Sequence, residues 1–280
     1  MCAPIVESAP AKINLALHVT GRREDGYHLL DSLVAFAGIG DRVTLVPGPM
    51  SLKIDGPFGA GLGNDCTNLC WKAAELAGVG ASAGVSIALQ KNLPVASGIG
   101  GGSADAAAVL RGLARMGYDV PEGVECLGAD IPVCLLSRPA RMQGIGDVLT
   151  PLHHFPAISA VLVNPGISLS TPEVFRALTS RDNAPLGPVP HFAGIADLIA
   201  WLRQTRNDLE PVARSLQPHI ARVIEALENS GAGFARMSGS GATCFGLYAN
   251  ETQARNAAEI LARNGWWAVA TELVPAASGR

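Results

Sequence analysis

Apolar and polar residues alternate along residues 11–19, near the start of the chain. One set of alternating positions holds Ile13, Leu15, Leu17 and Val19, and the other holds Lys12, Asn14 and His18. A period of two is typical of a strand with one face on the core and the other in solvent. The pattern therefore predicts a half-buried strand whose lysine and asparagine point away from the core.

Further along the chain, short apolar runs alternate with longer segments of helical period. The short runs predict strands at 42–46, 85–89, 161–163 and 243–248. Helical patterns cover 68–76, 104–116, 194–204, 208–217, 218–229 and 252–263. Because strands and helices mix throughout, we expect an α+β fold with mixed or antiparallel sheets packed against helices. We also expect two domains, at 1–155 and 156–280, with the last strand able to return to the first domain.

One loop stands out by its glycines, namely Leu93-Pro94-Val95-Ala96-Ser97-Gly98-Ile99-Gly100-Gly101-Gly102-Ser103, and a helical pattern follows it from Ala104. Glycine lets the backbone approach a ligand, and a helix N-terminus attracts anions, so the loop predicts a phosphate site. Ser103 is expected at the N-cap and Asp105 in an acidic first turn. The loop does not end in the Gly-Lys-Ser/Thr of a Walker A sequence, and it fits a dinucleotide fingerprint poorly. A glycine turn that only tightens a strand–helix junction is the alternative.

Four other segments hold groups suited to chemistry, each with a structural alternative. Lys12 can contact phosphate or activate a hydroxyl, or it is a solvent-facing strand lysine. Asp130, at a helix start marked by a proline, can accept a proton from an attacking hydroxyl or cap the helix. The stretch Met237–Thr243 allows close backbone approach or is a plain turn. Tyr27 and His28 can stack on a base and hydrogen-bond its edge, or they are a core tyrosine and a surface histidine.

Composition and charge narrow the range of functions. The net charge is −3 and charged residues make up 16% of the 280 residues, so we expect no nucleic-acid partner. Hydrophobic residues make up 48%, as in globular proteins. The sequence shows neither a signal peptide nor an apolar run of about 18 residues, so we expect a cytoplasmic protein with no membrane partner. The six cysteines lack zinc-type spacing, so we expect free thiols and no protein-bound metal.

These segments, in this order, resemble the GHMP kinase superfamily of small-molecule kinases. Leu93–Ala104 is similar to its ATP loop, Leu127–Pro132 to the segment with its catalytic aspartate, and Ser238–Ala242 to its third motif. Pro10–Leu15 and Gly21–His28 resemble one branch, which phosphorylates a cytidine-diphosphate-linked alcohol on the non-mevalonate route to isoprenoids. The resemblance implies a two-domain GHMP kinase fold with the active site in the cleft between domains, and ATP and Mg²⁺ as partners of the reaction.

The resemblance also implies roles for individual residues. Asp130 would be the general base for the substrate's 2-hydroxyl, and Lys12 would hold this aspartate ionised and steady the developing charge. The substrate would be bound by Asn14, Tyr27, His28 and Thr171, with the tyrosine and histidine on its cytosine ring. The nucleotide would be bound by Asn68, near the adenine, and by Pro94, Val95, Ala96, Ser97, Gly98, Ile99, Gly100, Gly101, Gly102, Ser103 and Ala104.

Three other functions are compatible with parts of the sequence. Another GHMP enzyme, such as a homoserine, mevalonate or sugar kinase, would share the glycine motifs, but Lys12-Ile13-Asn14 together with Gly26-Tyr27-His28 argues against it. A nucleotide-binding module without catalysis is disfavoured because both Lys12 and Asp130 are present. A dinucleotide-binding oxidoreductase would need an acidic residue at a strand end about 20 positions past the loop, which is missing. For the kinase we expect a monomer or a weak homodimer.

Overall fold

The computed structural model describes residues 3–80 and 84–274, which form two compact units. The first unit consists of Met1–Ala11, Ile39–Val95 and Gly100–Ser137, and the second of Lys12–Gly38, Ala96–Ile99 and Arg138–Arg280. The strands β1 (Ile5–Arg22) and β2 (His28–Gly48) pair with each other, and each contributes residues to both units.

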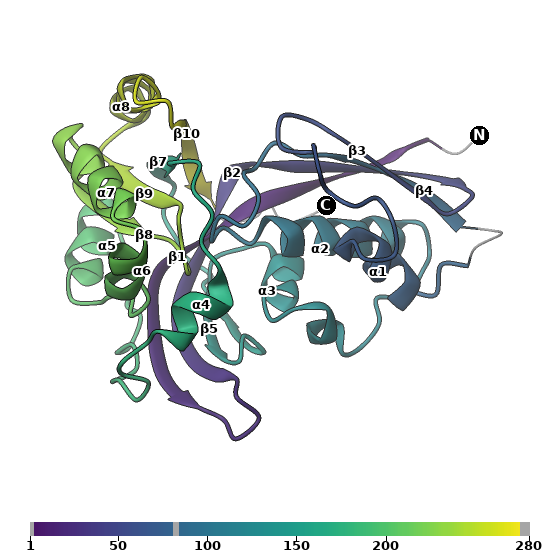
Figure 1. Ribbon diagram of the computed structural model, residues 1–280, viewed down its shortest axis with the longest axis horizontal. Helices are drawn as coiled ribbons and strands as arrows, with labels where there is room; N and C mark the ends of the chain where they lie inside the picture. Colours follow the sequence, from purple (N-terminus) through teal and green to yellow (C-terminus); the bar gives the residue numbers. More distant parts are fainter. Residues whose placement is uncertain (1–2, 81–83, 275–280) are drawn as a thin grey trace. The chain divides into compact units, whose positions relative to one another are not determined.

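In the first unit, helices pack together beside three strands (Figure 1). The last part of β2, β4 (Gly84–Gln90) and β3 (Ser51–Asp55) lie side by side, with β4 antiparallel to β2 and parallel to β3. The helices are α1 (Leu69–Leu76), α2 (Gly101–Arg115), the 3-10 helix Val124–Leu127 and α3 (Ile131–Leu136). The helix α2 packs between α1 and α3 and comes close to β2, because a Cβ on Gly112 would lie only 2.3 Å from Leu45 Cδ1.

The second unit is an antiparallel sheet with helices packed against it (Figure 1). Its strands follow the order β8-β9-β7-β10-β2, and the hairpin β5-β6 pairs with β2. The strands are β5 (Ala140–Gly144), β6 (Val148–Pro151), β7 (Ile158–Asn164), β8 (Phe234–Met237), β9 (Cys244–Tyr248) and β10 (Trp267–Val274). The helices are α4 (Thr171–Arg176), α5 (Ile195–Leu202), α6 (Glu210–Leu216), α7 (His219–Asn229) and α8 (Glu251–Ala262). Among these, α7 packs on β8 and β9, and α8 packs on β7 and β10.

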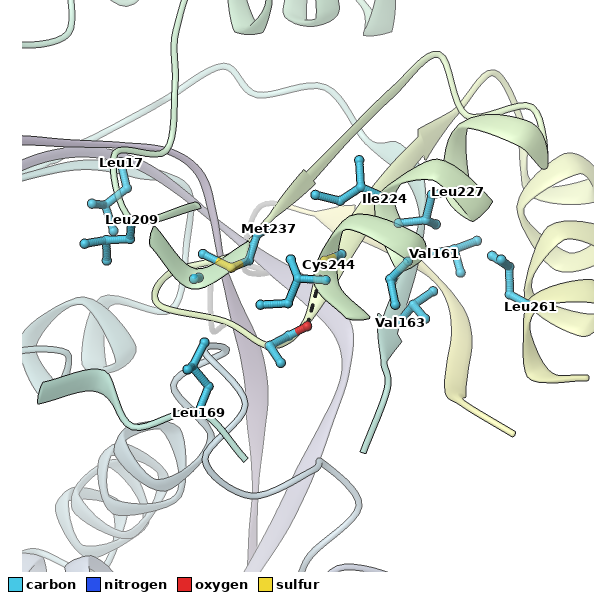
Figure 2. Close-up of a cluster of buried hydrophobic side chains, with 14 of the residues drawn as sticks. Leu17, Val161, Val163, Leu169, Leu209, Ile224, Leu227, Met237, Cys244 and Leu261 are labelled. Carbon is cyan, nitrogen blue, oxygen red and sulfur yellow. Dashed lines mark hydrogen bonds between the residues drawn. The ribbon is translucent and has the colours of Figure 1, made fainter. Parts of the chain in front are cut away.

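The core of the second unit gathers apolar side chains from segments that are far apart in the sequence (Figure 2). Val161 and Val163 of β7, Cys244 of β9 and Leu227 of α7 are all fully buried. Leu17, from the other end of the chain, belongs to the same cluster. Removing such side chains from water contributes roughly 1.5–3 kcal/mol for each large one, so this cluster is a main source of stability for the unit.

Most of these elements agree with the sequence predictions. Each predicted helix is present within about three residues of its expected bounds, and the predicted strands overlap β1, β2, β4, β7 and β9. The α+β fold with mixed sheets is confirmed. The predictions missed β3, β5, β6, β8, β10 and α4, several of which have only four to six residues. Segments this short hold too few periods for a pattern to be recognised. The division near residue 155 stays a prediction.

The prediction that the first strand is half-buried is wrong. Lys12, Asn14 and His18 are 4%, 0% and 3% exposed, so both faces of β1 are covered here. The His18 ring shows how the polar face is covered: its Nδ1 lies 2.9 Å from the Ala184 carbonyl, and its Nε2 accepts from Arg206 N–H at 3.2 Å. Burial lowers the pKa of His18, in keeping with a neutral ring. The alternation therefore separates an apolar face from a buried polar face.

We expect Leu227→Ala to destabilise the protein, because it removes a fully buried side chain and leaves a cavity. The free energy of unfolding should fall by about 2–5 kcal/mol, measured by urea denaturation followed by circular dichroism. Ile260→Ala on α8 is the control, since Ile260 is 52% exposed, and its effect should stay below about 1 kcal/mol. Equal losses in the two variants would contradict the placing of Leu227 in the core.

Candidate active site

The segment Ala96–Ile99 of the glycine-rich loop is held in the second unit by backbone hydrogen bonds from two other segments. Lys12 N–H, on β1, donates to the Ile99 carbonyl at 2.9 Å. Thr243 N–H, just before β9, donates to the Ser97 carbonyl at 3.0 Å. The path of this part of the loop is therefore set by main-chain contacts.

The Ser238 hydroxyl joins the same three segments. Asn14 N–H donates to Ser238 Oγ at 3.0 Å, and this hydroxyl donates to the Gly98 carbonyl at 3.1 Å. Ser238 is fully buried, so losing either partner would leave a buried polar group without a hydrogen bond. One side chain thus connects β1, the glycine-rich loop and the loop before β9.

Two glycines make the contact between the loops possible. Gly98 has φ +75° and Gly239 has φ +55°, a region that residues with a Cβ rarely adopt. A Cβ on Gly98 would lie 2.6 Å from the carbonyl oxygens of Gly241 and Ser238, and one on Gly239 would lie 2.7 Å from the Gly98 carbonyl oxygen. Both small-residue loops are expected to allow a close approach of the backbone. In the structure the two loops approach each other.

Lys12 and Asn14 lie beside this contact. The interpretation of Lys12 as a solvent-facing lysine is wrong, because the residue is only 4% exposed. Asn14 Nδ2 donates to Ser32 Oγ at 2.8 Å, and Ser32 Oγ donates to the Ala16 carbonyl at 2.6 Å. This leaves Asn14 Oδ1 as a buried acceptor without a hydrogen-bond partner. Such an oxygen is available to a ligand hydroxyl.

The remaining part of the glycine-rich loop begins α2 in the first unit. Gly100 is the N-cap, with φ +64°, and its carbonyl accepts from Ala104 N–H at 2.8 Å. The prediction of Ser103 as N-cap is wrong, since a glycine in the left-handed conformation starts the helix three residues earlier. Asp105 is likewise buried in the second turn, not the first. Residues 101–103 form the first turn of α2. The N–H groups in the first turn of a helix have no acceptor within the helix, and they attract anions.

Asp130 is the N-cap residue of α3, and Pro132 follows within the first turn, as predicted. The Asp130 side chain makes no capping hydrogen bond, so helix capping does not account for this carboxylate. The preceding segment lies near the start of α2, because a Cβ on Gly128 would be 3.9 Å from Ser103 Oγ. The turn that contains Asp130 therefore lies beside the N-terminal turn of α2.

Asn68 also lies near the start of α2. Its side chain caps α1: Oδ1 accepts from Cys70 N–H at 2.9 Å, and Nδ2 donates to the Gly63 carbonyl at 2.8 Å. The next residue, Leu69, contacts the first turn of α2, where a Cβ on Gly102 would lie 3.5 Å from Leu69 Cδ1. The cap thus fixes the position of Asn68 relative to the helix that carries the glycines.

The sequence predictions missed a buried ion cluster at the base of α2. Lys91, the residue after β4, binds Asp41 of β2 and Asp105 of α2. These residues are 3%, 2% and 3% exposed, respectively. Burial raises the pKa of Asp105 to about 8, although Lys91 works against this rise. The available signal was a lysine directly after an apolar strand and a single aspartate among alanines.

Tyr27 and His28 follow the turn between β1 and β2. Tyr27 is 58% exposed, whereas the His28 ring stacks on Phe175 of α4 with ring centroids 4.7 Å apart, so the pair is not a core tyrosine and a surface histidine. His28 Nε2 is buried without a hydrogen-bond partner. Burial, together with Arg22 and Arg181, lowers the pKa of His28. An exposed phenol beside a neutral imidazole suits contact with a nucleobase. Phe175 had no signal in the sequence.

Thr171 begins α4 and contacts the loop before β9, where its Oγ1 lies 2.7 Å from Ser240 Oγ. In the second unit, contacts around the loop before β9 connect Lys12, Asn14, residues 96–99 and Thr171. In the first unit, the start of α2 contains residues 100–104 and lies near Asn68 and the turn of Asp130. Pro94 and Val95 lead into the loop, and Val95 is 50% exposed.

The cysteines and the acidic residues do not form a metal centre in the part of the chain that the structure describes, where no group of three His, Cys, Asp or Glu side chains could hold an ion. Among the described residues, Cys66, Cys70, Cys126, Cys134 and Cys244 form no disulfide bond, and Cys2 lies outside the described residues. Across residues 3–80 and 84–274, we find no helix with the length and apolar character that a membrane span requires.

Two family models match separate stretches of the chain. The model of the GHMP kinases N terminal domain matches residues 68–148, and the model described as GHMP kinases C terminal matches residues 190–265. Together they cover more than half of the sequence, so the chain belongs to the GHMP kinases, and it is a small-molecule phosphotransferase with ATP as the phosphoryl donor.

Relatives define the branch within this class. The chain is 57% identical over 273 residues to the 4-diphosphocytidyl-2-C-methyl-D-erythritol kinase of Paracoccus denitrificans (strain Pd 1222), covering 96% of this chain and 97% of that protein. The protein of the same name from Jannaschia sp. (strain CCS1) is 53% identical, with 92% and 94% covered. The chain belongs to the family of the 4-diphosphocytidyl-2-C-methyl-D-erythritol kinases.

Solved structures agree with this assignment. A crystal structure of 4-(cytidine 5'-diphospho)-2C-methyl-D-erythritol kinase matches with a TM-score of 0.76 and 37% identity, covering 96% of this chain and 98% of that one. L. major mevalonate kinase matches with a TM-score of 0.63 but only 18% identity, with 99% and 98% covered, which shows a shared fold alone. The prediction of a GHMP kinase fold is thereby confirmed.

We expect Gly98→Ala to disrupt the junction of the two loops, because the new methyl group would meet the Ser238 and Gly241 carbonyls at 2.6 Å. Gly265→Ala is a matched control, since Gly265 has φ +77° but no atom lies within 4 Å of the place that its Cβ would take. Both variants lose about 1–2 kcal/mol of stability through backbone strain. Only Gly98→Ala should lose more stability than that, and only this variant should bind ATP more weakly. Thermal denaturation and nucleotide titration measure the two effects, and equal behaviour of the variants would contradict the contact.

Proposed function

We propose that this enzyme transfers the γ-phosphoryl group of ATP to the 2-hydroxyl of 4-diphosphocytidyl-2-C-methyl-D-erythritol, giving the 2-phosphate and ADP on the non-mevalonate route to isopentenyl diphosphate. The observation that carries this proposal is the 57% identity to the Paracoccus denitrificans kinase over 96% of the chain. The geometry of each unit supports it, because a glycine-started helix and a fixed backbone loop are what a triphosphate requires.

The loop from Pro94 to Ala104 is proposed to bind the triphosphate, with Asn68 near the adenine. Support comes from the first turn of α2, whose N–H groups and helix dipole favour anions. Mg²⁺ is proposed to enter as the magnesium complex of ATP, held by the phosphate oxygens, as is usual for this ion. The ion would neutralise part of the charge that spreads over the transferred group.

Asp130 is proposed as the general base that accepts the proton of the 2-hydroxyl. Its carboxylate is not used for capping α3 and lies in a turn near the anion-binding end of α2. Lys12 is proposed to hold the aspartate ionised and to steady the charge that develops during transfer. Its burial supports this role, because buried lysines are rare unless they serve a specific partner. Phosphoryl transfer depends mainly on such positioning and charge stabilisation.

The substrate is proposed to bind to Asn14, Tyr27, His28 and Thr171. The exposed ring of Tyr27 and the neutral His28, with its buried Nε2 still open, support contact with the cytosine ring. The open Oδ1 of Asn14 supports contact with a hydroxyl near the reacting centre. Thr171 is connected to the loop before β9 through Ser240, which supports a place at the substrate.

The wider organisation is also part of the proposal. We propose an N-terminal ATP-binding domain at 1–155 and a C-terminal domain at 156–280, supported by family models that match 68–148 and 190–265. We further propose a cytoplasmic enzyme that acts as a monomer or weak homodimer and binds neither nucleic acid nor membranes. The low net charge of −3 is consistent with the lack of a nucleic-acid partner.

The direct test is incubation of the full-length protein with ATP, Mg²⁺ and 4-diphosphocytidyl-2-C-methyl-D-erythritol, with the product identified by mass. A gain of one phosphoryl group on the alcohol, with release of ADP, is the expected result. Homoserine and mevalonate serve as comparison substrates in the same assay. Turnover of either, with none of the cytidine-linked alcohol, would overturn the proposal.

We expect Asp130→Asn to lower kcat by at least about 10²-fold while the Kd for ATP stays close to wild type, because only the proton acceptor is removed. Steady-state kinetics and nucleotide titration measure the two quantities. Asp119→Asn, an exposed aspartate on the same unit, is the control and should keep its kcat. Turnover of Asp130→Asn at the wild-type rate would exclude Asp130 as the base.

For Tyr27→Ala we expect the KM of the cytidine-linked substrate to rise by about 10-fold, because stacking on a base contributes about 1–3 kcal/mol. The KM for ATP should not change. Tyr27→Phe keeps the ring and should stay near wild type, which separates stacking from the hydroxyl group. An unchanged substrate KM in Tyr27→Ala would rule out contact of this ring with the cytosine.

A further inference from the structure

The ion cluster of Asp41, Lys91 and Asp105 lies directly behind the glycine-rich loop. Lys91 Nζ donates to Asp105 Oδ2 at 2.7 Å and also to Asp41 Oδ2. Asp41 Oδ1 accepts from the backbone N–H groups of Asn92 and Leu93 at 2.5 and 2.8 Å. The cluster thereby holds the residue before the glycine-rich loop and the first residue of the loop.

The same cluster contacts the other end of the loop. A Cβ on Gly101 would lie 3.0 Å from Lys91 Nζ and 3.7 Å from Asp41 Oδ2. Asp105 lies one turn further along α2. The charged groups therefore support the first helical turn from behind, the turn whose N–H groups are proposed to face the phosphates.

The cluster contains one cation and two carboxylates, and their hydrogen bonds differ. Asp41 uses both oxygens, with Lys91 on one and two backbone N–H groups on the other. Asp105 binds Lys91 through Oδ2, whereas its Oδ1 is buried without a hydrogen-bond partner. A buried carboxylate oxygen without a partner is costly when ionised and much less so when the group is neutral. The spare proton therefore belongs on Asp105.

We propose that Asp41, Lys91 and Asp105 are positioning residues that fix the glycine-rich loop for ATP, and that Asp105 takes part as the neutral acid. This inference rests on the proposed ATP-dependent function. A neutral Asp105 keeps a second negative charge away from the helix turn that attracts the triphosphate. Its ionisation places an uncompensated negative charge one turn behind the phosphate-binding N–H groups and weakens ATP binding.

The groups around Asp105 are few. Lys91 and Asp41 act on it most strongly, and Cys70 of α1 faces the same cluster with a thiol whose pKa is raised by burial. The helix α3 carries no charged side chain within its bounds. Charged residues elsewhere on the neighbouring elements are exposed or belong to ion pairs at the far end of α2, namely Arg42, Lys72, Glu75, Glu7, Arg111 and Arg115.

The direction of the pH dependence follows from the burial of Asp105, which raises its pKa from 3.8 to about 8. The unfolded chain releases this proton near the ordinary value, whereas the folded protein keeps it to about pH 8. The contribution of Asp105 to stability is therefore fully present below pH 3.8 and falls as the pH rises from 3.8 to about 8. Above about pH 8 it no longer changes. Asp105→Asn removes this slope.

The test is to titrate MgATP into full-length wild type and Asp105→Asn by calorimetry near pH 7 and near pH 9, on either side of the raised pKa of about 8. The wild-type Kd should rise by at least about threefold at the higher pH, and that of Asp105→Asn by less than about 1.5-fold. Asp119→Asn, exposed on the same unit, should keep the wild-type ratio. Equal ratios in wild type and Asp105→Asn would overturn the role of the neutral acid.

Infrared spectroscopy reads the proton without reference to ATP. The wild-type spectrum near neutral pH should contain a protonated-carboxyl band that is absent from Asp105→Asn and present in Asp119→Asn, and the lack of such a difference would overturn the proposal. If wild type binds no ATP, the proposed function fails, yet the infrared band still decides the protonation of Asp105.

Lys91→Gln tests positioning. We expect the KM for ATP to rise by at least about tenfold, with the KM of the alcohol within about twofold of wild type. A rise in both or in neither would contradict a role specific to the ATP loop. The calorimetric and infrared measurements use only the aspartate variants, so they remain decisive should Lys91→Gln fail to fold.

Discussion

The rest of the candidate site in the second unit depends on one contact, the backbone-to-backbone approach of the glycine-rich loop and the loop before β9. Gly98 and Gly239 allow it because neither carries a Cβ and both adopt positive φ. At this spacing the Ser238 hydroxyl reaches the Asn14 N–H and the Gly98 carbonyl together. A single added methyl group would separate the loops and leave a buried hydroxyl without its partners. Lys12, two residues before Asn14 on β1, is positioned by the same contact.

The other end of the glycine-rich loop is held by a different kind of interaction. In the first unit, charged side chains replace the backbone contact, with Asp41 accepting from two N–H groups and Lys91 joining it to Asp105. Burying such charges is costly, so a buried ion cluster adds little net stability by itself. A loop rich in glycine loses much entropy on ordering, and both kinds of anchor offset that loss where the ligand requires a fixed backbone.

The residues proposed for substrate recognition are assembled from distant parts of the chain. His28, at the turn of the β1–β2 hairpin, is held by Phe175 of α4, about 150 residues further along. Thr171, at the start of the same helix, is held by Ser240. One short helix therefore fixes two parts of the proposed substrate site. The L. major mevalonate kinase, at 18% identity, shares the fold alone, so the fold by itself does not specify these contacts.

The sequence by itself determined the α+β class, most helices, the glycine-rich loop and the segments that hold Lys12, Asp130 and the Tyr27–His28 pair. These follow from local periodicity, from the backbone freedom of glycine and from a resemblance to a kinase family, all of which act over short stretches. Only the tertiary structure decided that the polar face of β1 is buried, that Gly100 starts α2, and that Phe175 holds His28. It also revealed the cluster around Lys91. The burial of a side chain and the partners that it contacts depend on which distant segments of the chain cover it. The local pattern of apolar and polar residues does not contain this information.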